Sequence, residues 1–539
     1  MIRTSDLERF ISDFEERLAP VERTADEVWW NLAISGTNEA QEEFVAAGKA
    51  YSALFSDTDE YRKLRELFEN LDSVDSLLLR RRIEVLYRMF EERQGDEETL
   101  GRIEELEAEA NAIYGNHRSV VGGEKLVENE VRELLRTSED VGLRREGWEA
   151  SKSVGRAVEG TVRELARLRN RLAREQGYED HYARSLELQE IQAPELAGIM
   201  EDLTSATDAP FRKLKGDLDA ELRRKFGVEE VMPWHLSGPF FHRAPDVAGV
   251  DLDRYFEGKN LEDLTRKTFD GLGLDVRGVI SRSDLYEREG KSQHAFCTRI
   301  GREYPYDVRV LGNVRPDANW MDAMLHEFGH AVYYRHVNPR LPYLLRSFAH
   351  ANTTEAIALM MGALVDDAGW LRSVAGAARE DLEEDAAKLA AHRRVDRMIL
   401  TRFVLVMYHF EQALYADPES EDLNPLWWGL VERYFYVDRP PGRHEPDWAA
   451  VIHVAVAPVY YHNYMLGELI SAQLRNYLES HITQGPFYDN EVAGRYLLES
   501  FFGPGARENW KDTVLRATGE PLNADYFVRS IQKGGSRTA

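Results

Sequence analysis

The sequence has a single cysteine, Cys297, among its 539 residues. One thiol can form neither an intramolecular disulfide nor a multi-cysteine metal knuckle. No window approaches the roughly 18 unbroken apolar residues of a membrane span, and the opening segment MIRTSDLERFISDFEERL lacks the apolar stretch of a signal peptide. These absences predict a cytoplasmic protein that does not contact a membrane.

Positive charge is also scarce, because 68 Lys and Arg face 95 Asp and Glu, for a net charge of −27. Binding to nucleic acid needs a basic face, so this balance excludes nucleic acid as a partner. Hydrophobic residues make up 43% and charged residues 30%, which is typical of a soluble globular protein. The sequence contains no internal repeat and no low-complexity tract, and the oligomeric state stays open.

The spacing of apolar residues predicts a mostly α-helical fold. Up to about residue 230, apolar side chains recur every three or four positions, as they do at Leu7, Ile11, Phe14 and Leu18. The segments HAFCTRIG and YDVRVLGNV predict one small β-sheet at about 284–315, and helices resume near residue 320. We expect a single intertwined unit over 1–539, with a mainly helical lobe at 1–230 and a second half at 231–539.

The segment MDAMLHEFGHAVYYRHV carries the chemistry, because it contains His326, Glu327 and His330. Positions four apart lie on one face of a helix, so both imidazoles can bind one metal ion. Zinc suits them, and Glu327 stands where its carboxylate can accept a proton from water that the metal activates. The alternative, a chance match on a buried helix, is rare for such a pattern.

A catalytic zinc site of this kind needs a third protein ligand. Glu355 begins an apolar helical segment within the expected zinc helices at about 320–365, and it would complete a His-His-Glu set. His350 is the rival ligand. Glu355 could instead be a first-turn acid favoured by the helix dipole, with Thr353 or Thr354 as the cap.

These residues resemble a known family. Glu355-Ala356-Ile357, 25 residues after His330, and the intervening LPYLLR resemble the angiotensin-converting enzyme family of gluzincin dipeptidyl carboxypeptidases. The segments LNPLWWGLVERYF and EVAGRYLLESFFGPG are similar to later helices of that family. HEFGHA and YEREGKSQHAFC show a weaker likeness to oligoendopeptidase F and thimet oligopeptidase. The resemblance implies two helical lobes with a deep central cleft, the first carrying its lid, and one zinc ion per chain.

The resemblance also implies roles for further residues. His294 and Ala295 match the edge strand on which the family lays the peptide backbone. His453 and Tyr464 match the pair that donates hydrogen bonds to the oxyanion of the scissile carbonyl, although their spacing is one residue longer here. Tyr461 matches a substrate-binding tyrosine.

Departures from the family bear on specificity. Val451 replaces the lysine that holds the substrate's C-terminal carboxylate, and Leu359 replaces an acid behind the zinc ligands. Arg243 either substitutes for a carboxylate-binding glutamine or is a surface loop residue. We therefore predict hydrolysis of short unstructured peptides. A strict dipeptidyl carboxypeptidase is the alternative, and a non-catalytic zinc or peptide-binding protein is a remote one.

Overall fold

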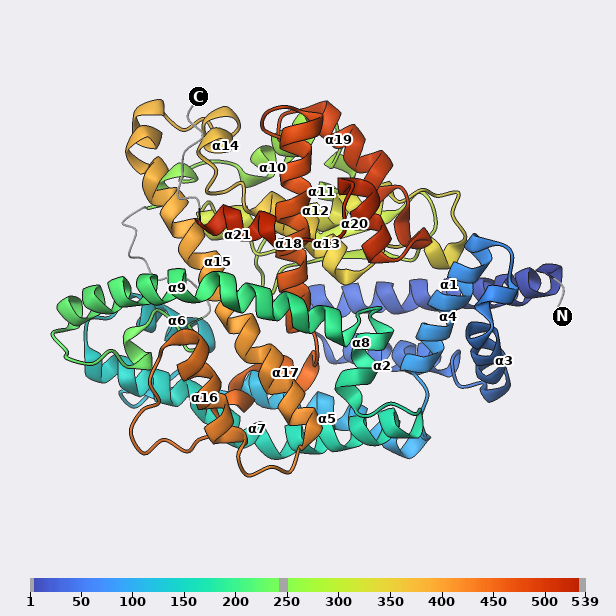
Figure 1. Cartoon of the computed structure of the whole chain (residues 1–539), viewed down its shortest axis with the longest axis horizontal. Helices are drawn as coiled ribbons and strands as arrows, with labels where there is room; N and C mark the ends of the chain where they lie inside the picture. Colours follow the sequence, from blue (N-terminus) through green and yellow to red (C-terminus); the bar gives the residue numbers. More distant parts are fainter. Residues whose placement is uncertain (1–3, 242–250, 533–539) are drawn as a thin grey trace. The chain divides into compact units, whose positions relative to one another are not determined.

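The computed structural model describes residues 4–241 and 251–532 of the chain. As predicted, the fold is mostly α-helical (Figure 1). Its contacts divide the chain into two compact units. The first unit comprises Met1–Gln94, Asp251–Glu384 and Leu466–Tyr526, and the second comprises Gly95–Val250, Asp385–Met465 and Phe527–Ala539. Each unit is therefore assembled from three separate stretches of sequence.

The first unit holds the predicted metal motif and contains helices together with one pair of strands. They are α1 (Thr4–Ser35), α2 (Asn38–Ala53), α3 (Thr58–Glu69), α4 (Leu77–Glu92), α10 (Leu261–Gly271), α11 (Arg277–Ile280), β3 (Phe296–Ile300), β4 (Asp307–Leu311), α12 (Ala318–His336), α13 (Ala351–Gly362), α14 (Ala368–Ser373), α19 (Glu491–Leu497) and α20 (Trp510–Thr518). The strands β3 and β4 pair antiparallel, with Cys297 opposite Val310.

The second unit is built around long helices and a short hairpin. Its elements are α5 (Glu97–Asn116), β1 (Ser119–Val121), β2 (Glu124–Leu126), α6 (Glu128–Thr137), α7 (Val141–Glu175), α8 (His181–Leu188), α9 (Ala193–Phe226), α16 (Leu423–Phe435) and α17 (Ile452–Val456). Three further helices begin in one unit and end in the other, namely α15 (Arg379–Ala416), α18 (Tyr461–Tyr477) and α21 (Asp525–Gln532).

Helix α1 follows the apolar period read from its sequence. Leu7, Ile11, Phe14 and Leu18 are buried, and the Phe14 ring lies 5.1 Å from that of Phe90 on α4. The second half of α1 supports the strands, because the Asp26 carboxylate accepts a hydrogen bond from the Gly301 N–H at 2.9 Å. The N-terminal helix thus packs in the unit that holds the metal motif.

The β1–β2 hairpin is an additional element that the sequence analysis missed. Val121 pairs with Glu124, which leaves Gly122 and Gly123 as a two-residue turn. Both glycines have positive φ, +59° and +86°, as a tight hairpin turn that matches the strand twist requires. The Gly-Gly pair was the available signal, but each strand has only three residues.

None of the described helices is long and apolar enough to cross a membrane.

Candidate metal centre

His326 and His330 project from the same face of α12. The Asp317 side chain caps this helix by accepting a hydrogen bond from the Trp320 N–H at 2.8 Å. From there the helical pitch brings the two imidazole rings, four residues apart, to a centroid separation of 4.9 Å. Burial lowers the pKa of His326 to about 4 and the pKa of His330 well below its usual value. Both rings are therefore neutral at pH 7, as metal ligands must be.

Glu355 on α13 faces these two rings. Its Oε2 lies 3.6 Å from His326 Nε2 and 3.9 Å from His330 Nε2. The three candidate ligand atoms all lie within 4.8 Å of one another. Two imidazole nitrogens and a carboxylate oxygen are the donor set of many catalytic zinc sites, so the side chains present fit zinc. Within the described residues, no other group of three His, Cys, Asp or Glu side chains meets the same criterion.

Two glycines allow the backbones around Glu355 to approach closely. A Cβ atom on Gly329, between the two histidines, would lie 2.8 Å from the Cα of Ala358 on α13. A Cβ on Gly467, in the part of α18 that belongs to the first unit, would lie 3.0 Å from the Cβ of Glu355. Any larger side chain at Gly329 would push α13 away from α12.

Thr354 is a site residue whose role the sequence analysis did not identify. Its Oγ1 lies 2.7 Å from His330 Nδ1. Nε2 of His330 faces Glu355; with a metal ion on Nε2, the proton would reside on Nδ1, and Nδ1–H would donate a hydrogen bond to the hydroxyl oxygen. The position of Thr354 directly before Glu355 in the sequence was the feature from which this role could have been predicted. His350, the rival ligand, instead caps α13, and its Nδ1 accepts a hydrogen bond from the Asn352 N–H at 3.1 Å.

Glu327 lies between the ligands in sequence and against strand β3 in space. Its carboxylate accepts a hydrogen bond from the Cys297 N–H. Burial, followed by the nearby negative charge of Glu355, raises the pKa of Glu327 to about 8. A metal ion held by the two neighbouring imidazoles would act in the opposite direction and favour the charged carboxylate. With such an ion bound, the half-buried Glu327 carboxylate would be suited to accept a proton from water.

His294 and Ala295 directly precede β3 and do not form part of it. His294 is exposed and Ala295 is half-buried. The loop that leads to them is fixed by the Ser292 N–H, which donates to the Ala33 carbonyl at the end of α1 at 2.8 Å. These residues therefore lead directly into the strand whose Cys297 N–H donates to the Glu327 carboxylate.

The remaining predicted residues lie together in the second unit. The ring centroid of His453 on α17 is 4.7 Å from that of Tyr461 and 6.3 Å from that of Tyr464, both on α18. Burial lowers the pKa of His453 and raises the pKa of Tyr461 above its usual range. The imidazole is therefore neutral and the Tyr461 phenol protonated at pH 7. Arg243 lies outside the described residues.

A family model described as angiotensin-converting enzyme matches residues 2–240 and 298–528. The matched part includes His326, Glu327, His330 and Glu355, whereas His294 and Ala295 fall in the unmatched interval. A search of curated proteins finds no match.

Proposed function

Since the chain belongs to the angiotensin-converting enzyme family and is therefore a zinc metallopeptidase, we propose that it hydrolyses internal peptide bonds of short, unstructured peptides. The observation that carries this proposal is the convergence of His326, His330 and Glu355 beside the half-buried Glu327 carboxylate. A cytoplasmic location is part of the proposal.

In this proposal His326, His330 and Glu355 hold one zinc ion per chain. Bound there, zinc supplies Lewis acidity that polarises the scissile carbonyl and lowers the pKa of the attacking water. Glu327 accepts the proton of that water on its carboxylate and passes it to the leaving amine. The Cys297 N–H orients the Glu327 carboxylate for both transfers.

The resemblance to the family supplies further residues of the proposed mechanism. Tyr464 and His453 donate hydrogen bonds to the oxygen of the tetrahedral intermediate as its charge develops. The backbone of His294 and Ala295 binds the extended peptide through main-chain hydrogen bonds, and Tyr461 binds the substrate through its phenol. The match to the family supports the roles of Tyr464, His453 and Tyr461, whereas His294 and Ala295 lie outside the matched residues.

Replacing Glu327 by Gln tests the central claim. The change removes the base but leaves His326, His330 and Glu355, so zinc content should stay at one ion per chain. Turnover of a fluorogenic peptide should fall by about 10²–10⁴-fold. Zinc is measured by elemental analysis, and thermal unfolding reports whether the fold is intact.

Chelation of the wild-type protein provides the matching control. Activity should disappear with zinc and return when one equivalent is added. Wild-type turnover in Glu327→Gln, or full activity of the zinc-depleted protein, would contradict the proposal.

Release of C-terminal dipeptides is the second candidate, favoured by membership in the family. Such an enzyme needs a partner for the substrate's free carboxylate two residues beyond the cut. Val451 occupies the position of the family's lysine, and it is an apolar side chain that is only 4% exposed. Tyr461 then remains as the matched hydrogen-bond donor to this carboxylate. Arg243 is the candidate for a cation that binds it. This loss of the lysine favours an oligopeptidase with a relaxed preference for the terminus.

One peptide with a free C-terminus and its C-terminally amidated form distinguish the two activities. An oligopeptidase should cut both forms at the same internal bonds at similar rates, as read by mass spectrometry. Dipeptide release that amidation abolishes would reject the oligopeptidase and direct attention to Arg243.

A further inference from the structure

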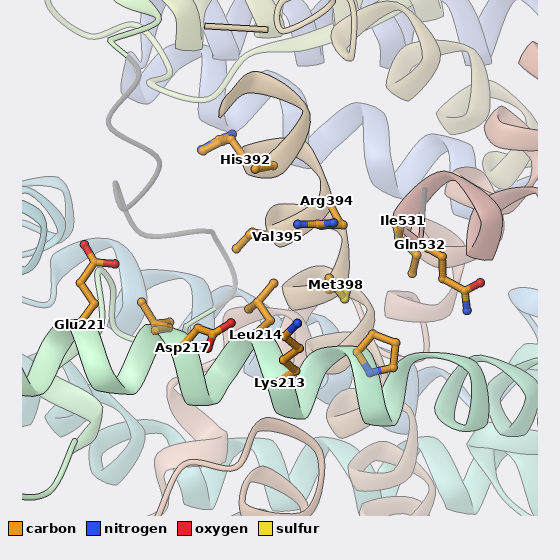
Figure 2. A pocket seen from close by; sticks show the side chains of 13 residues that line it. Lys213, Leu214, Asp217, Glu221, His392, Arg394, Val395, Met398, Ile531 and Gln532 are labelled. Carbon is orange, nitrogen blue, oxygen red and sulfur yellow. The ribbon is translucent and has the colours of Figure 1, made fainter. Parts of the chain in front are cut away.

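A cavity of about 460 Å³ lies in the second unit, and none of the residues discussed above lines it. It is formed by α9, α15 and the end of α21 (Figure 2). Figure 2 shows Leu214 on α9 and Val395 on α15 facing each other across the cavity, with Met398 and Ile531 beside them. This volume lies within the range of pockets that hold small ligands.

Most of the cavity wall is apolar, and charged and polar side chains form the rest of the lining. Pro210, Leu214, Leu218, Val395, Met398 and Ile531 provide the apolar part. A hydrocarbon chain would gain from leaving water for this surface, at about 25 cal/mol for each Å² buried. The lining alone, however, does not select one apolar molecule from another.

Arg394 provides the selective feature. Its side chain lines the cavity, and its Nε is shielded from solvent without a hydrogen-bond partner among the described residues. A buried donor of a cationic group that has no partner costs free energy, and a carboxylate is the group that a guanidinium binds best. Lys213, on the facing helix α9, adds a second positive charge to the lining.

Acidic side chains on α9 give one part of the cavity lining a negative charge. Asp217 and Glu221 follow Lys213 at intervals of four residues along α9 and are exposed. They would repel a second anionic group at their end of the cavity. The charges therefore favour a ligand with one carboxylate, placed at Arg394, over a dicarboxylate.

We propose that this cavity binds a medium-chain aliphatic monocarboxylate, with its carboxylate on Arg394 and its chain against Leu214, Val395, Met398 and Ile531. The proposal is independent of the peptidase activity. The site would give the protein a second, non-catalytic ligand of a different chemical class from its peptide substrates.

Calorimetric titration of the zinc-loaded full chain with hexanoate, octanoate and decanoate tests the proposal. Each buried CH₂ should lower the dissociation constant by about fourfold. Each added pair of methylenes should therefore lower it by about 16-fold, until the cavity is filled. Decylamine, with the same chain and the opposite charge, should bind at least tenfold more weakly than decanoate. Equal or tighter binding of decylamine would overturn the proposal.

Two variants locate the binding. Arg394→Gln should weaken decanoate binding by tenfold or more, whereas Arg224→Gln, at an exposed position of α9, should leave it unchanged. Val395→Phe should reduce decanoate binding more than hexanoate binding, because the added ring occupies the space of the chain. Peptide hydrolysis and the thermal midpoint confirm that each variant is folded.

Carboxylates also bind zinc, and the Arg394 variant separates the two sites. Binding at the metal centre does not depend on Arg394. Decanoate binding that persists undiminished in Arg394→Gln, or no binding to the wild-type protein below millimolar concentration, would overturn the proposal.

Discussion

Thr354 and Glu355 are neighbours in sequence and serve the same metal centre in different ways. The Glu355 carboxylate faces both imidazoles, while the Thr354 hydroxyl lies 2.7 Å from His330 Nδ1. A partner on the far nitrogen fixes the ring's tautomer and orientation. The contact with Nδ1 therefore makes Thr354 the candidate positioning residue for His330.

Thr354→Val keeps the shape of the side chain but removes the acceptor for His330 Nδ1–H. Zinc affinity, measured by competition with a chelator, should fall by about 10–100-fold. Thr354→Ser restores the hydroxyl and should recover most of the affinity. If valine and serine variants bind zinc equally well, the hydroxyl has no positioning role.

Tyr464 can be tested in the same way against a neighbouring tyrosine. Tyr464→Phe should lower turnover by about 10²–10³-fold without a matching change in substrate affinity, because an oxyanion donor acts in the transition state. Tyr460, whose ring centroid is 5.3 Å from that of Tyr464, provides the control, and Tyr460→Phe should retain activity. An effect of Tyr464→Phe on KM alone would refute the assigned role.

The pair of helices α12 and α13 is the element on which the metal centre depends. The ligands on α12 are positioned by the pitch of one helix, but Glu355 reaches them only because α13 packs close to Gly329. At this position a methyl group would meet the Ala358 backbone, which cannot move aside as a flexible side chain can.

Gly329→Ala should therefore destabilise the protein, by about 1–3 kcal/mol, and weaken zinc binding together with stability. Gly216→Ala on α9 is the matched control, because a Cβ there has no neighbour within 4 Å. That change should be stabilising, by roughly 0.5–1 kcal/mol. Thermal unfolding and chelator competition measure both effects, and a harmless Gly329→Ala would show that α13 has room to move.

At the scale of the whole molecule, the buried amino group of Lys152 makes stability depend on pH. Lys152 is 4% exposed, and its Nζ lies 3.1 Å from the centre of the Phe240 ring. Burial, opposed by the charge of Asp447, lowers the pKa of Lys152 from 10.5 to about 7. Between these two values the unfolded chain binds a proton that the folded chain does not, so this group raises the stability as pH increases.

Lys152→Met should remove that dependence. The gain in the thermal midpoint should be larger at pH 6, where the wild-type amine is charged in the folded state, than at pH 10, where it is neutral. Lys125→Met, on an exposed part of β2, should show no such difference. An equal effect of Lys152→Met at both pH values would contradict the assignment.

Features that depend on local geometry or on a family pattern could be predicted from the amino-acid sequence. The mostly helical fold followed from apolar spacing, such as that of Leu7, Ile11, Phe14 and Leu18, because helical pitch converts spacing into a face. The pairing of His326 with His330 followed from the same pitch. Glu355 was one of two candidates for the third ligand, and the structure brings its carboxylate to within 3.6 Å of His326.

Contacts between residues far apart in the chain became known only from the folded structure. It brought the Cys297 N–H to Glu327, gave His330 its partner in Thr354 and made His350 a helix cap. It also placed α1 with the metal motif and opened a cavity beside Arg394. These outcomes depend on close packing between elements far apart in the chain, where one missing Cβ, as at Gly329, decides how near two helices can lie.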